Sequence, residues 1–242
     1  FRPANRQNDF KTDVYFCPNK NDLKRLKYLM GLRNPNYKML GSPRFSEEWR
    51  VKLEEIYKHE INILKNKYSK KNIVTFFLTK KKHNIFQEEV FRIINYLSNL
   101  KEVTILVKPH TWGHQDYKRY FVKQENIEIV DKFSSFALQK ISDIIFFSAT
   151  SVVIDAIAEK KNVYHLHKTV SNKLIYDNYF STLTVDCREE VFEKVVFYLK
   201  NKRKTNIIES EKNKFQKDIL FPTKKDVLNI HLSYIKEMIG KN

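Results

Sequence analysis

Glycine is scarce in this sequence, and its scarcity excludes the two common phosphate-binding loops. Four glycines occur among 242 residues: Gly31, Gly41, Gly113 and Gly240. The dinucleotide-binding fingerprint and the P-loop both need closely spaced glycines, because backbone amides must approach a phosphate closely. Phosphate binding by this chain would therefore depend on hydroxyl side chains at a helix start.

Cysteine and long apolar runs are also sparse. Cys17 and Cys187 lack metal-ligand spacing and are too few for a disulfide framework, which favours a reduced, cytoplasmic setting. No apolar stretch approaches the ~20 residues of a membrane-spanning helix. The polar residues after Phe1 do not form a secretory signal. We expect no metal and no cofactor.

Acidic residues are outnumbered by basic ones. The chain has 45 Lys and Arg against 28 Asp and Glu, a net charge of +17. A basic surface attracts nucleic acid, anionic membranes or phosphorylated substrates. The lysines are spread over nearly every segment, which favours a general solvated surface over a nucleic-acid face. We therefore expect no nucleic-acid partner and leave open a peripheral contact with the inner face of the membrane.

Hydrophobic residues make up 42% of the chain, enough for a substantial core. Apolar runs alternate with segments of helical periodicity, which predicts parallel βαβ units. The fold class predicted is α/β, a doubly wound, Rossmann-like parallel sheet with helices on both faces. We expect a lead-in segment at residues 1–70 and a nucleotide-binding domain at residues 71–242. The strands of that domain are predicted at 73–78, 103–107, 127–130, 144–147, 162–166 and 183–186.

Residues 142–158 are the most informative stretch. A buried strand at 144–147 is followed by four small residues, Ser148 to Ser151, and then by helical spacing from Val152. Hydroxyl groups cap a helix start, where free amides and the helix dipole also attract phosphate. A plain capped helix explains the stretch equally well. Ligands of doubly wound sheets bind beyond the strands' carboxyl ends, which adds Thr79-Lys80 and 108–110 to this stretch.

Three blocks of the sequence resemble the carboxy-terminal, donor-binding domain of GT-B glycosyltransferases of bacterial surface polysaccharide synthesis. They are GSPRF at 41–45, VKPH at 107–110 and SDIIFFSATSVVIDAIAEKKNVYHL at 142–166. Similar blocks occur in capsule polysaccharide enzymes, Kdo transferases, CDP-glycerol glycerophosphotransferases and non-hydrolysing UDP-GlcNAc epimerases. The resemblance extends over residues 12–199 and implies a GT-B carboxy-terminal domain.

The resemblance also implies roles for individual residues. His110 would donate to a phosphate oxygen or the leaving group, and Lys108 would neutralise developing charge. Asp155 stands where these enzymes place an acidic residue for ribose hydroxyls, although many of them have the longer Glu. The residues implied in nucleotide and phosphate binding are Ser148, Thr150, Ser151, Asp155, Thr79, Lys80 and Arg44.

Each of these residues also has a structural interpretation. His110 fits a strand-ending turn, Lys108 a solvated lysine, Asp155 a helix-dipole partner and Arg44 a guanidinium that holds a loop. His165 and His167 lack a nearby carboxylate or Cys of ligand spacing, so we expect a structural or cleft-lining role.

The predicted function is that of a glycosyltransferase, or its donor-binding domain, which uses a nucleotide-activated sugar and a glycan or lipid-linked acceptor. A CDP-glycerol-type polyol-phosphate transferase, a UDP-sugar epimerase and a basic nucleic-acid-binding module are the alternatives. The chain shows no clear arrangement for a catalytic base, so we expect an amino-terminal domain to supply it.

Overall fold

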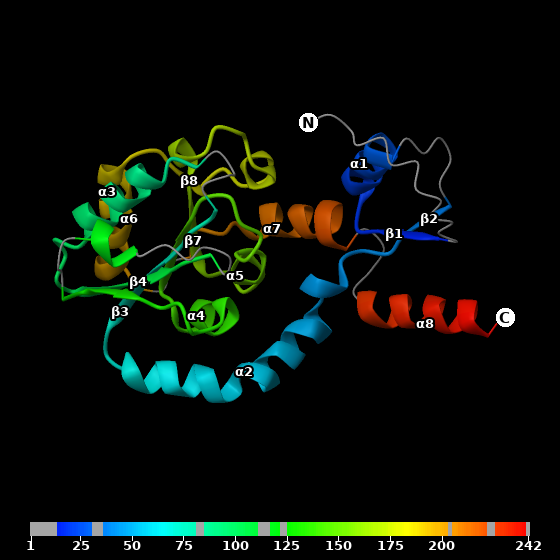
Figure 1. Cartoon of the computed structure of the whole chain (residues 1–242), viewed down its shortest axis with the longest axis horizontal. Helices are drawn as coiled ribbons and strands as arrows, with labels where there is room; N and C mark the ends of the chain where they lie inside the picture. The colour runs from blue at the N-terminus through cyan, green and yellow to red at the C-terminus, as the bar shows by residue number, and fades with distance from the viewer. Residues whose placement is uncertain are drawn as a thin grey trace. The chain divides into compact units, whose positions relative to one another are not determined.

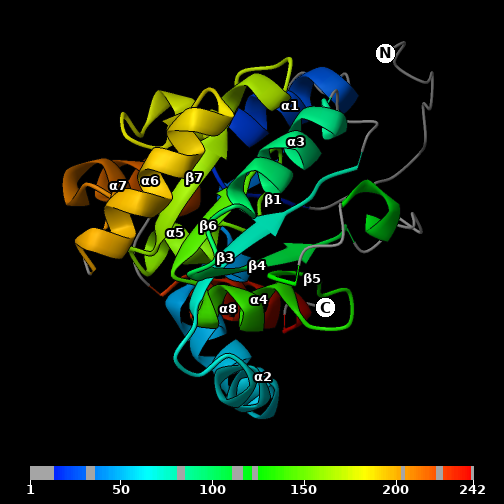
Figure 2. The same ribbon diagram turned by 90° about the vertical axis from the view of Figure 1, so that its left-hand side faces the viewer.

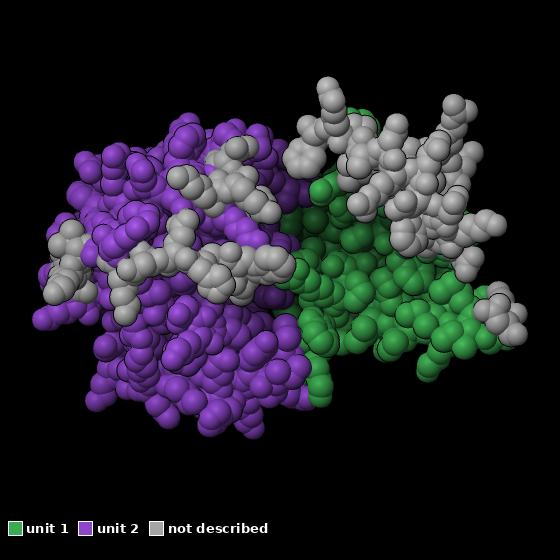
Figure 3. Space-filling view, viewed as in Figure 1, with its two compact units in different colours: residues 1–52, 213–242 green, residues 53–212 purple. Residues whose placement is uncertain are grey.

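The computed structural model describes residues 14–30, 36–80, 85–110, 117–121, 125–202, 205–221 and 226–240. The chain forms two compact units (Figure 1, Figure 3). Unit 1 comprises residues 1–52 and 213–242, and unit 2 comprises residues 53–212. The domain boundary at residue 70 stays a prediction. No helix within the described ranges is long and apolar enough to cross a membrane.

Unit 2 contains a six-stranded, fully parallel sheet in the order β5-β4-β3-β6-β7-β8. The central strands are buried on both faces, as their continuous apolar sequences predict. Phe76 of β3 stacks on Phe146 of β6, with ring centroids 5.0 Å apart. The strands are β3 (Asn72–Phe77), β4 (Val103–Lys108), β5 (Ile127–Ile129), β6 (Ile144–Phe147), β7 (Asn162–Leu166) and β8 (Thr184–Val185).

Helices cover both faces of this sheet (Figure 2). On one face, α3 (Gln87–Leu97) and α6 (Arg188–Lys200) pack on each other and on the main apolar core. On the other face lie α4 (Ser135–Ile141) and α5 (Ile154–Ala158). Two helices, α2 (Glu47–Lys67) and α7 (Glu209–Phe215), cross the boundary between the units. The predicted doubly wound α/β fold is confirmed.

The strand order determines where a ligand can bind. From the central β3, the chain adds β4 and β5 on one side, then returns and adds β6, β7 and β8 on the other. This is the order of the classic dinucleotide-binding sheet, in which the crevice opens where the direction reverses. The reversal lies between β3 and β6, at their carboxyl ends.

At the opposite edge of the sheet, where the strands begin, Asp143 holds β3 and β6 in place. Its Oδ2 accepts from the Ile73 amide at 2.7 Å, and its Oδ1 accepts from the Tyr198 hydroxyl at 2.8 Å. One carboxylate thus joins the starts of β3 and β6 to α6. Burial and this carboxylate raise the pKa of Tyr198.

Unit 1 contains a small two-stranded parallel sheet, β1 (Tyr15–Cys17) and β2 (Tyr37–Met39). Its helices are α1 (Lys20–Met30) and α8 (Val227–Ile239). Asn19 begins α1: its Oδ1 accepts from the amides of Asn21 and Asp22. Gly41 has a φ of +87°, and a Cβ there would lie 2.8 Å from the Leu220 carbonyl oxygen, so this position requires glycine.

Candidate functional site

The carboxyl edge of the sheet is defined by one row of paired residues. Lys108, Phe77, Phe147 and His165 lie side by side on β4, β3, β6 and β7. The chain leaves each strand immediately after this row or one residue beyond it. The segments predicted to bind a ligand, 79–80, 108–110 and 148–151, therefore lie at the ends of adjacent strands, along one edge of the sheet.

Thr79 connects two of these segments. Its hydroxyl donates to the Ala149 carbonyl oxygen at 3.0 Å, and its own carbonyl accepts from Gln87 Nε2 at 3.0 Å. Thr79 is only 4% exposed. The structure therefore brings Thr79 and the turn at residues 148–151 together, with the start of α3 attached to the same residue.

Ser148 is buried, and its hydroxyl lies 2.8 Å from the Thr169 hydroxyl. Thr169 donates its single hydroxyl proton to the Leu166 carbonyl, at 2.6 Å. Ser148 must therefore be the donor in the Ser148–Thr169 bond, since a hydroxyl has only one proton. In this arrangement Ser148 anchors the turn to the segment after β7 and has no proton left to offer a phosphate.

Thr150 and Ser151 have a different environment. Thr150 Oγ1 accepts from the Val152 amide at 3.2 Å, and the Thr150 carbonyl accepts from the Tyr176 hydroxyl at 3.0 Å. Thr150 is half-buried, and Ser151 is exposed. Because Thr150 accepts through its oxygen, its proton is available to a ligand.

The helix after this turn is shorter than its sequence predicts. It begins at Ile154, and its cap residue Val153 forms no side-chain cap bond. Residues 152–153 form a turn because Ile154 N donates to the Ser151 carbonyl, at 3.2 Å. A five-residue helix contributes little dipole, so hydroxyls and turn amides are the main donors here.

His110 lines a small cavity at this edge. The cavity has a volume of about 80 Å³, and Thr150, Pro109, Leu78 and Ser135 also line it. It thus lies where the ends of β3, β4 and β6 meet. The predicted residues His110 and Thr150 share one cavity.

Lys108 is placed differently from a cleft-lining or solvated lysine. It is 5% exposed, and its Nζ donates to the Asp131 carbonyl at 2.6 Å, on the segment that follows β5. Burial lowers the pKa of Lys108, and the carboxylates of Asp131 and Glu60 oppose this effect. In this geometry Lys108 holds the segment after β5 against β4.

The remaining predicted residues, Lys80, Asp155 and Arg44, do not line the small cavity. Lys80 is half-buried directly after Thr79, and Asp155 is half-buried in the first turn of α5. Arg44 belongs to unit 1, where its guanidinium lies 5.2 Å from the Phe45 ring centroid. Unit 2 therefore contains Thr79, Lys80, His110, residues 148–151 and Asp155, whereas Arg44 belongs to unit 1.

Sequence reasoning did not predict the hydrogen bonds that support the turn. A 3₁₀ turn, Ile175–Asn178, carries Tyr176, which bonds to Thr150, and Asp177, whose Oδ1 lies 2.8 Å from His165 Nδ1. Farther out, His167 Nδ1 lies 3.0 Å from Asp186 Oδ1. Within the described residues, no group of three or more His, Cys, Asp or Glu side chains could hold a metal ion.

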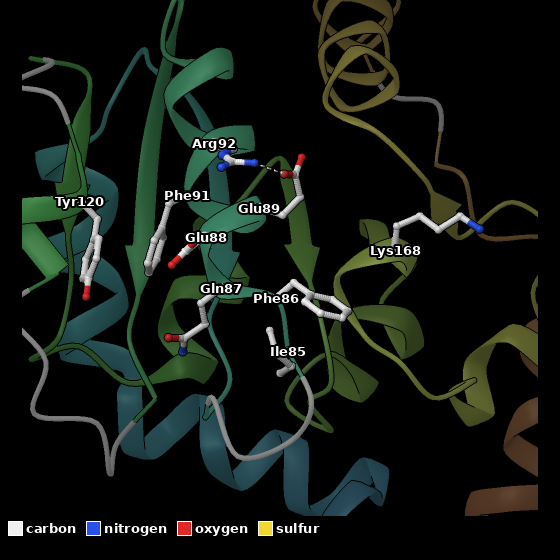
Figure 4. A pocket seen from close by; sticks show the side chains of 9 residues that line it. All are labelled: Ile85, Phe86, Gln87, Glu88, Glu89, Phe91, Arg92, Tyr120 and Lys168. Carbon is white, nitrogen blue, oxygen red and sulfur yellow. Dashed lines mark hydrogen bonds and ion pairs between the residues drawn. The ribbon is translucent and has the colours of Figure 1, made fainter.

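A larger cavity of about 480 Å³ lies beside the start of α3 (Figure 4). Tyr120 lies on one side and Lys168 on the other, with the first turns of α3 between them. This volume falls within the range of small-molecule sites. Sequence reasoning did not predict this cavity, because its walls come from segments distant in the chain.

No protein-family model matches the chain, and no curated protein matches its sequence. Solved structures match its fold. The wall teichoic acid polymerase TagF matches with a TM-score of 0.57 and 15% identity, over 95% of this chain and 57% of that one. The UDP-GlcNAc 2-epimerase from Neisseria meningitidis, bound to UDP-GlcNAc, matches with a TM-score of 0.56 and 12% identity, over 96% and 62%.

The chain has the GT-B-like fold of these enzymes. A complex of MnaA from S. aureus with UDP supports the same conclusion: its TM-score is 0.60 at 13% identity, over 95% of this chain and 60% of that one. The predicted resemblance is confirmed at the level of fold. The chain spans less than two thirds of the length of each of these proteins.

Proposed function

We propose that unit 2 binds a nucleotide-activated donor for a glycosyltransferase of bacterial surface polysaccharide synthesis. The observation that supports this most is the meeting of three strand ends, β3, β4 and β6, around one cavity at the reversal of strand order. Such crevices hold nucleotides in doubly wound sheets. The relatives of like fold include structures with bound UDP-GlcNAc and UDP.

The donor phosphates would bind at the turn after β6. Thr150 and Ser151 supply hydroxyl donors, which form strong bonds to a charged phosphate oxygen. Ser148 and Thr79 hold the turn in place from below. Lys80 would add positive charge, and Asp155 would accept from the ribose hydroxyls.

His110 would assist departure of the nucleotide. Transfer breaks the bond between the sugar carbon and a phosphate oxygen, and it forms a bond from that carbon to the acceptor oxygen. A His110 proton donated to the phosphate would stabilise the negative charge that develops there. The buried Lys108 would act through its positive charge and its bond to Asp131 rather than by contact.

The proton of the acceptor hydroxyl needs a base, which we assign to an amino-terminal domain. We therefore expect this chain alone to bind the donor nucleotide and to show weak or no transfer. Sustained turnover by the isolated chain would contradict this assignment.

Polyol-phosphate transfer from a donor such as CDP-glycerol is the second candidate, because TagF structures, two of them soaked with CDPG, have the same fold. A UDP-sugar epimerase is the third, because epimerases match equally well. Their products separate the three: an epimerase converts its UDP-sugar into the epimer without any acceptor, and the two transferases join either a sugar or a glycerol phosphate to an acceptor.

A thermal-shift panel of UDP, GDP, CDP, CMP and ADP tests the proposal. A nucleotide present at 100 times its dissociation constant stabilises the folded state by about 2.7 kcal/mol. We expect one base to raise the melting temperature by several degrees, saturably and with little dependence on salt. A nucleic-acid module would instead bind DNA or RNA with steep salt dependence. Failure of every nucleotide to stabilise the chain would contradict donor binding.

A further inference from the structure

The 480 Å³ cavity beside α3 has features of a binding site for a small polar molecule. Its apolar wall includes Phe86, which is 59% exposed although it is a large aromatic residue. Phe91 and Tyr120 form a second, rigid wall, with ring centroids 4.6 Å apart and planes 23° from parallel. The exposed Phe86 ring offers flat apolar surface, and the fixed aromatic pair adds a second wall at low entropic cost.

Charged groups at the rim of this cavity balance one another. Glu88 and Glu89 belong to the first turn of α3, while Arg92 and Lys168 are cations. Arg92 Nη1 lies 3.4 Å from Glu89 Oε2 (Figure 4). Two carboxylates and two cations among the lining residues give no net charge, and Lys168 Nζ also lies 3.8 Å from Asp186 Oδ2, so the rim does not favour another phosphate. Carboxylates accept from hydroxyl groups and cations donate to them, so the rim suits a neutral molecule with many hydroxyls.

The cavity is connected to the proposed phosphate site through Thr169. The Phe86 amide donates to the Thr169 carbonyl at 2.8 Å, and the Thr169 hydroxyl accepts a hydrogen bond from the Ser148 hydroxyl. Gln87, also in the cavity wall, donates to the Thr79 carbonyl. The cavity walls and the phosphate turn are therefore held by the same two residues.

We propose that this cavity binds one sugar ring, with the apolar face of the sugar on Phe86 and its hydroxyls on Glu88, Glu89 and Lys168. The inference depends on the proposed donor function, which brings an activated group to the neighbouring turn. The sugar belongs either to the acceptor glycan or to the donor itself. Both present the same chemistry, and the two sources differ in whether the sugar binds without a nucleotide.

The experiment is an NMR titration of the ¹⁵N-labelled chain with the methyl glycosides of glucose, galactose, N-acetylglucosamine and rhamnose. We expect one glycoside to shift amides at the start of α3 and near Lys168, saturably, which identifies an acceptor sugar. If only a nucleotide-linked sugar shifts them, and the nucleotide alone does not, the cavity holds the donor sugar. The amides of residues 148–152 report nucleotide binding separately in the same sample, so failure of the donor function is distinguishable.

Phe86→Ala is the decisive variant, and Phe197→Ala is its matched control. Phe197 is also an exposed phenylalanine, at 53%, on α6 and away from this cavity. Loss of an aromatic contact should weaken binding of the sugar roughly 3- to 10-fold in Phe86→Ala, and Phe197→Ala should bind as the natural sequence does. Glu88→Gln, isosteric and exposed, should weaken it as well and gives a second test if Phe86→Ala perturbs the fold. The proposal is wrong if no free or nucleotide-linked sugar shifts these amides, or if the shifts persist unchanged in both cavity variants.

Discussion

The Tyr176 hydroxyl donates to the carbonyl oxygen of Thr150 across 3.0 Å. Tyr176 is 4% exposed, and its ring packs edge-on against Phe147, the last residue of β6. The next residue, Asp177, bonds to His165 and to the Leu174 amide. Asp177 thus fixes this short 3₁₀ turn to the sheet, and Tyr176 supports the proposed phosphate turn.

Tyr176→Phe should weaken nucleotide binding while leaving the fold intact. The variant keeps the ring but removes the bond that positions Thr150, and one such bond contributes about 0.5–1.5 kcal/mol. We expect the dissociation constant to rise roughly 3- to 10-fold in calorimetric titration. Tyr198→Phe is the control, because it removes a hydroxyl bonded to Asp143 at the opposite edge of the sheet. Equal affinities for the two variants would refute a positioning role for Tyr176.

Ser148 and Thr150 should separate stability from binding. Ser148→Ala removes a buried donor to Thr169 and should lower the free energy of unfolding by about 1 kcal/mol with little effect on affinity. Thr150→Val removes a proposed phosphate donor and should weaken nucleotide binding about 10-fold or more. Urea unfolding and titration of both variants measure the two effects. A stronger binding defect in Ser148→Ala would show that its hydroxyl turns to the phosphate.

Asp143→Asn should affect stability alone. Both carboxylate oxygens accept hydrogen bonds, and an amide replaces one acceptor with a donor. We expect a loss of about 1–3 kcal/mol in the free energy of unfolding, with nucleotide affinity unchanged. An acidic residue at this strand start is part of the resemblance to GT-B enzymes. Weakened nucleotide binding in a folded Asp143→Asn protein would contradict its purely structural assignment.

His165 should make the chain sensitive to mild acid. It is fully buried, and burial lowers its pKa, although Asp177 and Asp186 oppose this effect and His167 adds to it. Below pH 6.5 the unfolded chain binds a proton that the folded chain resists, so stability is lost as the pH falls from 6.5 towards the lowered pKa. The slope has an upper limit of about 1.4 kcal/mol per pH unit.

The measurement is the unfolding free energy between pH 7.5 and 5 for the natural sequence, His165→Asn and His59→Asn, where His59 is an exposed histidine of α2. The slope should become shallower in His165→Asn alone. Identical slopes in the three proteins would show that His165 is not the titrating group.

The sheet was predictable because its strands are short apolar runs with no helical period. The apolar run at 144–147 and its two neighbouring strands are compatible with few arrangements other than a parallel sheet. The start of α5 was predicted wrongly, since Val152 and Val153 have helical spacing and yet form a turn.

The contacts that define the site could not be predicted, because they join residues distant in sequence. Thr169 lies 21 residues after Ser148, and Tyr176 lies 26 after Thr150. Lys108 ends a strand in a Lys-rich chain, and nothing local indicates that the Asp131 carbonyl, 23 residues later, accepts from its ammonium group. Local patterns identify the edge of the sheet, while long-range bonds determine which hydroxyls remain available.

Amide chemical shifts during titration with the stabilising nucleotide test the central claim most directly. The account predicts saturable shifts at residues 79–80, 110 and 148–152, at the carboxyl edge of unit 2. Shifts that appear instead around Asp143 and Tyr198, or that spread over the surface lysines and vanish in salt, would contradict it.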